Sequence, residues 1–91
     1  MEFRITLHSG RAAPAHALDL LWERLDDGDD VRFAKVGPEI RVTWRVDAPT
    51  SMERDEREGI GRRAVLDIVY EICERTPELE SDWFAVSALR S

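Results

Sequence analysis

Apolar and polar side chains alternate along three stretches of the chain, which predicts three half-buried β-strands. In residues 2–8 the apolar positions are Phe3, Ile5 and Leu7. In residues 40–46 they are Ile40, Val42, Trp44 and Val46, and a shorter stretch places Val31 and Phe33 opposite Arg32 and Ala34. Gly37-Pro38 separates the last two stretches and predicts the turn of a hairpin. Residues 83–89 are mostly apolar and predict a last strand, in which either Trp83 or Phe84 faces the core.

Two other stretches have the apolar spacing of helices. The first follows Pro14 and has its apolar side chains at Leu18, Leu21, Trp22 and Leu25. The second ends at Thr76-Pro77 and has them at Ala64, Val65, Ile68, Val69, Ile72 and Cys73. Thr50 and Glu53 have the spacing of a capping box ahead of the second helix. Because glycine costs a helix about 1 kcal/mol relative to alanine, Gly59 and Gly61 predict a kink or a helix start near Gly61.

The predicted order is strand, helix, strand, strand, helix, strand. A crossover helix joins two parallel strands, and here a third strand fits between each such pair. Residues 1–91 therefore predict a single α+β domain, a ferredoxin-like βαββαβ two-layer sandwich. Its four-stranded antiparallel sheet has the strand order 4-1-3-2, and both helices lie on one face because a two-layer domain has one core.

The opposite face of this sheet is expected to be polar and basic. Its residues are Arg4, Thr6, His8, Arg32, Arg41, Thr43 and Arg45. The chain has 19 acidic and 13 basic residues and a net charge of −6, so setting these four arginines apart leaves −10 on the rest. This asymmetry of charge is the most distinctive feature of the sequence.

Three interpretations of the basic face remain open. It is a solvated face kept polar against aggregation, a contact surface for an acidic partner or a second copy, or an RNA-binding surface. Arginine suits the second because its planar fork pairs with carboxylates in a bidentate way. RNA recognition modules of the same topology stack bases on aromatic side chains of the central strands. Arginine and threonine stand there in this chain, so the RNA interpretation lacks its main requirement.

The segment Glu58-Gly59-Ile60-Gly61-Arg62-Arg63 suggests a second candidate site. A helix starting near Gly61 offers free backbone N–H groups, and Arg62 and Arg63 add positive charge for an anion such as phosphate. From Ile40 to Leu66 the chain resembles the coenzyme A loop of GCN5-related acetyltransferases, whose glycines match Gly59 and Gly61. The resemblance implies backbone amides that hold a pyrophosphate. The chain departs from that pattern at Glu56, where the family has Gln or Arg, and in the length of the connection after Val46.

Composition indicates a cytoplasmic protein. The single cysteine, Cys73, has no internal disulfide partner, the first residues lack the apolar stretch of a signal peptide, and no apolar run approaches a membrane span. Arginine outnumbers lysine twelve to one, which is typical of GC-rich coding DNA and indicates a bacterial source. His8 and His16 lie on different elements without cysteines or carboxylates at ligand spacing, so we expect no metal site and no cofactor.

These observations favour a non-catalytic protein-binding or regulatory module that acts through the basic face, as a homodimer or with a protein partner. Neither nucleic acid nor a membrane is an expected partner, because the net charge is negative. The alternative is a small enzyme that binds an acyl-coenzyme A at Gly59-Ile60-Gly61.

Overall fold

The computed structural model describes residues 1–8, 10, 12–45 and 53–89. Within these ranges the elements follow the predicted order: β1 (Glu2–Leu7), α1 (Ala17–Arg24), β2 (Val31–Val36), β3 (Glu39–Trp44), α2 (Arg54–Arg75), the short 3-10 helix η1 (Ser81–Trp83) and β4 (Phe84–Leu89). Val46 and Thr50, which belong to the predicted strand and capping box, lie outside the described residues.

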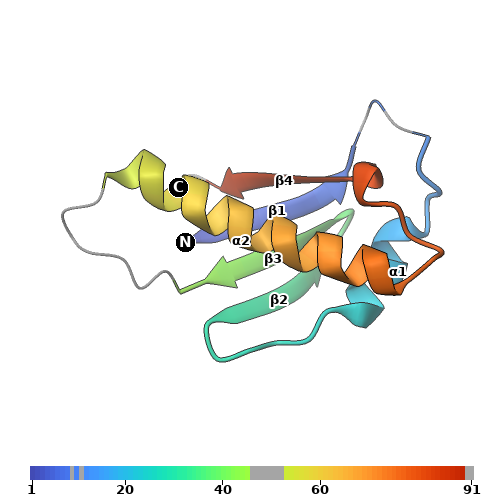
Figure 1. Ribbon diagram of the computed structural model, residues 1–91, viewed down its shortest axis with the longest axis horizontal. Coiled ribbons are helices and arrows are strands. Elements are labelled where there is room, and N and C mark those ends of the chain that lie inside the picture. The colour runs from blue at the N-terminus through green and yellow to red at the C-terminus, as the bar shows by residue number, and fades with distance from the viewer. Residues whose placement is uncertain (9, 11, 46–52, 90–91) are drawn as a thin grey trace.

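The four strands form one antiparallel sheet in the order β2-β3-β1-β4 (Figure 1). This is the predicted order read from the other edge. Since β3 lies between β1 and β2, and β1 lies between β3 and β4, each α-helix connects two parallel strands across a third. The predicted α+β fold with a four-stranded antiparallel sheet and two helices is confirmed, and the arrangement is consistent with a ferredoxin-like sandwich.

One face of the sheet is apolar and carries the core. Phe3, Ile5, Ile40 and Val42 on the two central strands have no exposed surface. The helices cover them with Leu18, Leu21, Val65 and Val69. The 22-residue α2 crosses the sheet from end to end, whereas the 8-residue α1 lies at one end only (Figure 1).

The start of β4 resolves which aromatic residue faces the core. Phe84 and Val86 are buried, whereas Trp83 belongs to η1 and is half-buried. The His8 N–H donates to the Trp83 carbonyl at 2.7 Å, which extends the pairing of β1 and β4 by one residue. The last strand is therefore one residue shorter than predicted, and its even-numbered side chains point inward.

The glycine pair lies inside α2 and does not start it. The helix is continuous from Arg54 to Arg75, so the expected helix start near Gly61 is wrong. A Cβ at Gly61 would lie 2.5 Å from Cζ of Phe3, whereas a Cβ at Gly59 would meet nothing within 4 Å. Gly61 therefore lets the helix approach β1 closely, and this tertiary contact offsets the low helix propensity of glycine.

Both edges of the sheet are partly engaged by side chains. On β2, the Phe33 N–H donates to Oδ1 of Asp27 at 2.9 Å, and on β4, the Val86 carbonyl accepts from Nε of Arg62 at 2.9 Å. Such contacts reduce the tendency of a strand edge to pair with another chain. In the described ranges, the helices are all too short or too polar to cross a membrane.

Candidate functional site

The sheet has a second face, which no helix of the described residues covers, and we call it the open face. It consists of the strand residues whose side chains alternate with the core: Glu2, Arg4 and Thr6 on β1, Arg32, Ala34 and Val36 on β2, Glu39, Arg41 and Thr43 on β3, and Ala85, Ser87 and Leu89 on β4. It holds five of the seven residues expected there, namely Arg4, Thr6, Arg32, Arg41 and Thr43.

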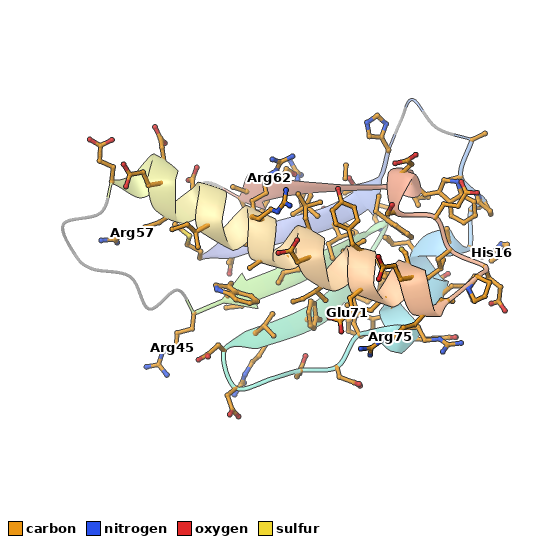
Figure 2. The ribbon with its side chains drawn as sticks, in the orientation of Figure 1. His16, Arg45, Arg57, Arg62, Glu71 and Arg75 are labelled. Carbon is orange, nitrogen blue, oxygen red and sulfur yellow. The ribbon has the colours of Figure 1, made fainter. Side chains whose placement is uncertain are left out.

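The other two expected residues lie beyond the strand ends. His8 follows β1 and Arg45 follows β3. Because β1 and β3 are antiparallel, these two side chains lie at opposite ends of the sheet. Figure 2 shows Arg45 at the end of β3, well outside the sheet. The seven residues therefore form no single cluster. His8 and Arg45 take no part in the centre of the open face.

Two arginines face each other at that centre. Arg4 on β1 is the direct partner of Arg41 on β3. The Met1 amino group and the Trp44 N–H exchange hydrogen bonds with each other's backbone carbonyls, at 3.0 and 2.8 Å. Hydrogen-bonded and non-hydrogen-bonded pairs alternate along an antiparallel ladder, so Arg4–Arg41, three pairs along from Met1–Trp44, is a non-hydrogen-bonded pair. In such a pair the Cα atoms are about 4.5 Å apart and the side chains are closest.

A third arginine lies diagonally beside them. Arg32 on β2 is the partner of Thr43, which stands two residues from Arg41 on β3. Diagonal neighbours of this kind are about 7–8 Å apart, within reach of long side chains. Arg32, Arg41 and Arg4 thus form a row of positive charge across three adjacent strands, which we call the arginine row.

The arginine row keeps many of its hydrogen-bond donors unused. Nε of Arg41 donates to Oε2 of Glu39 at 2.7 Å, and Nε of Arg4 donates to Oγ of Ser87 at 3.3 Å. Among the described residues, the Nη groups of Arg4 and Arg41 and the whole guanidinium of Arg32 have no partner. A guanidinium has five N–H donors in a planar fork, so several remain for an external acceptor.

The sequence interpretation overlooked two acidic residues on the same face. Glu2 and Glu39 have the same strand parity as Arg4 and Arg41. With three arginines and these two glutamates, the twelve residues of the open face have a formal charge of +1. The alternation in the sequence already predicts that both glutamates lie on this face, because each stands two residues before an arginine of the face. The open face is therefore only weakly positive, and its positive groups are the three arginines of the arginine row.

The four residues of the second candidate site do not converge. Gly59 is exposed and Gly61 is buried against β1, both within the helix. Arg62 projects from α2 toward β4 (Figure 2), and Arg63 pairs with Asp67 one turn along the helix at 3.4 Å. The N–H groups of the two glycines lie in the interior of α2, where helical carbonyls accept them, instead of at a free N-terminus.

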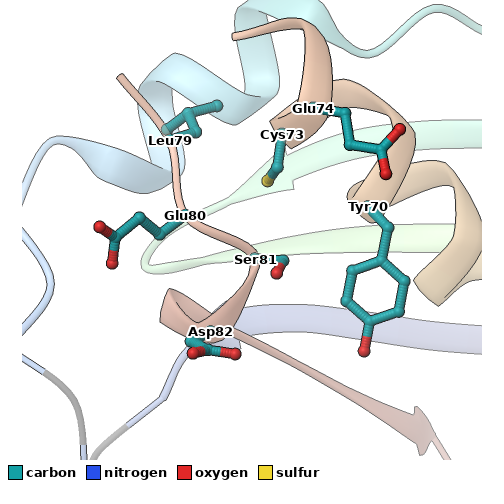
Figure 3. A pocket seen from close by; sticks show the side chains of 7 residues that line it. All are labelled: Tyr70, Cys73, Glu74, Leu79, Glu80, Ser81 and Asp82. Carbon is teal, nitrogen blue, oxygen red and sulfur yellow. The ribbon is translucent and has the colours of Figure 1, made fainter. Parts of the chain in front are cut away.

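A hollow of about 680 Å³ lies between α2 and η1 (Figure 3). Tyr70, Cys73, Glu74, Leu79, Glu80, Ser81 and Asp82 line it. Burial raises the pKa of the Cys73 thiol, so at neutral pH it stays protonated and is a poor nucleophile. The three carboxylates lie on different sides of the hollow, and within the described ranges no three potential ligands are grouped for a metal ion.

Comparison with models of protein families, with curated proteins and with solved structures gives no match to this chain. The functional argument therefore depends on the geometry and charge of the open face.

Proposed function

We propose that this ferredoxin-like protein is a non-catalytic, cytoplasmic protein-binding module that acts through its open face. The arginine row is the observation that carries this proposal. It places two guanidinium groups directly opposite each other on the central strands, with a third diagonally beside them on β2, in a chain of net charge −6. Most of their donors have no partner among the described residues. The proposed partner is a protein, either an acidic protein surface or a second copy of the chain.

The composition of the open face favours protein over nucleic acid. None of its twelve strand residues is aromatic, so it offers no ring on which a base stacks. The aliphatic side chains of Val36 and Leu89 on the outer strands add apolar contact area, and Val36 is 47% exposed.

Site-specific photo-crosslinking in cells tests the proposal. A photoreactive Thr43→p-benzoyl-phenylalanine variant, with its probe on the open face, is expected to form a discrete adduct with one protein. Glu71→p-benzoyl-phenylalanine, on the exposed side of α2, is the matched control and should not form that adduct. Adding Arg4→Glu and Arg41→Glu to the first variant should abolish it. An adduct that persists in this combination, or none at all, contradicts the proposal.

The alternative, an acyl-coenzyme A-binding enzyme, is not favoured by the helical geometry at Gly59 and Gly61. A ligand at one hundred times its Kd stabilises a protein by about 2.7 kcal/mol. We therefore expect millimolar coenzyme A to leave the thermal unfolding midpoint unchanged. A clear upward shift that Arg62→Gln and Arg63→Gln abolish would restore the enzyme hypothesis.

A further inference from the structure

We infer that the partner of the open face is an acidic helix of another protein, which the arginine row binds through carboxylates, and not a second copy of this chain. This inference rests on the proposed function and specifies its partner.

The first argument is the cost of the arginine row in the free protein. Like charges directly opposite each other on neighbouring strands destabilise a sheet. Arg4 and Arg41 occupy the pair geometry with the closest side chains. Among the described residues, Arg41 has a carboxylate partner, Glu39, and Arg4 has none. A carboxylate bound between the two guanidinium groups would remove the repulsion and use their Nη donors. An anionic ligand would therefore stabilise the two arginines more than water does.

The second argument concerns a second copy. A two-fold dimer places the same patch of both subunits face to face. With the axis at the centre of the open face, the Arg4–Arg41 pairs of the two copies would meet and bring four guanidinium groups together. Glu39 is already bonded to Arg41, and Glu2 lies one row away beside Thr43. Like charges in contact across an interface suppress association, so this self-association is opposed.

The third argument is spacing. Directly opposite residues of a sheet have Cβ atoms about 4.5–5.5 Å apart, and side chains at i and i+4 of a helix have Cβ atoms about 5–6 Å apart. Two glutamates one turn apart therefore match Arg4 and Arg41, and a third along the same stripe approaches Arg32. Val36 and Leu89 lie at opposite corners of the open face, Val36 opposite Glu39 and Leu89 opposite Glu2, where each offers apolar contact area to one side of the arginine row.

The direct test is titration of the isotope-labelled protein with an alanine-rich helical peptide that carries glutamates at i, i+4 spacing. The control peptide has glutamine at the same positions. We expect only the glutamate peptide to bind, to shift the amide signals of Arg4, Arg41 and Ser87, and to lose affinity as salt rises. Arg4→Gln with Arg41→Gln should weaken binding about tenfold or more, since charge-assisted pairs are lost.

Matched variants control for a general loss of positive charge. Arg63 and Arg75 lie on the exposed side of α2, each paired with a carboxylate one turn away. Arg63→Gln with Arg75→Gln removes the same charge and should change the affinity by less than about twofold. Equal losses for the two double variants would overturn the inference, because binding would then follow net charge alone.

The remaining outcomes separate this inference from the proposed function. A concentration-dependent dimer of the wild-type protein that Arg4→Gln and Arg41→Gln dissociate would overturn the inference and keep the proposed function. The inference alone also fails if the crosslink at Thr43 forms but the glutamate peptide does not bind. Tighter binding of a single-stranded oligouridylate than of the glutamate peptide would overturn both.

Discussion

The two faces of the sheet are made by alternate residues of the same strands, yet they have opposite properties. On the helix-covered face, Phe3 and Ile5 are fully buried and α2 approaches so closely that only glycine fits at position 61. On the open face, Arg4 lies between these two residues in sequence and opposes another arginine. The covered face therefore stabilises the fold, whereas the open face contains an arrangement that stability alone does not favour.

The largest difference in stability between the two faces is expected when adjacent residues of β1 are replaced by alanine. Ile5→Ala should lower the free energy of unfolding by about 2–5 kcal/mol, because it leaves a cavity in a fully buried site. Thr6→Ala, on the open face, should change it by less than about 1 kcal/mol. Chemical denaturation of both variants measures the difference. Similar losses at the two positions would mean that the open face is also packed against something.

Alanine substitution of the two glycines of α2 is expected to change the free energy of unfolding by smaller amounts and in opposite directions. Gly61→Ala should destabilise by about 1–2 kcal/mol, because overpacking against the buried Phe3 ring exceeds the gain in helix propensity. Gly59→Ala should stabilise by about 0.5–1 kcal/mol, since its Cβ enters open space. Thermal or chemical unfolding of the two variants tests this. A stabilising Gly61→Ala would show that α2 lies farther from β1 than the structure indicates.

These contrasts also explain how much the sequence predicts. Alternation and helical spacing are local signals, and they were sufficient for the element order and for the two faces of β1 and β3. From that order, the rule that a crossover helix joins parallel strands and the need for one core predicted the sheet topology. The same rules could not fix whether Phe84 or Trp83 faces inward, because both positions are apolar and the register depends on pairing with β1.

The candidate site was only partly predictable for the same physical reason. Gly61 was misinterpreted because its role is a contact with Phe3, which lies far away in the sequence. The Arg4–Arg41 pair depends on the register between β1 and β3, which no local pattern specifies. Residue types on the open face were thus predicted, whereas the arrangement that makes them a candidate site needed the tertiary structure.

The smallest expected effect tests the arginine row itself. Arg4→Glu places a carboxylate opposite Arg41 and converts a repulsive cross-strand pair into an attractive one, so it should stabilise the protein by about 0.2–1 kcal/mol. The gain should shrink as salt screens the pair.

Arg63→Glu is the matched control for this substitution. It replaces the i, i+4 pair with Asp67 by two like charges, and it should be slightly destabilising. Unfolding at low and high salt measures both variants, and a loss of stability from Arg4→Glu comparable to that from Arg63→Glu would contradict the repulsion. Suppose that Arg4→Glu stabilises the fold and also abolishes binding of the glutamate peptide. The Arg4 side chain then lowers the stability of the free protein and is needed for binding the peptide. That is the relation expected where a surface is kept for binding rather than for folding.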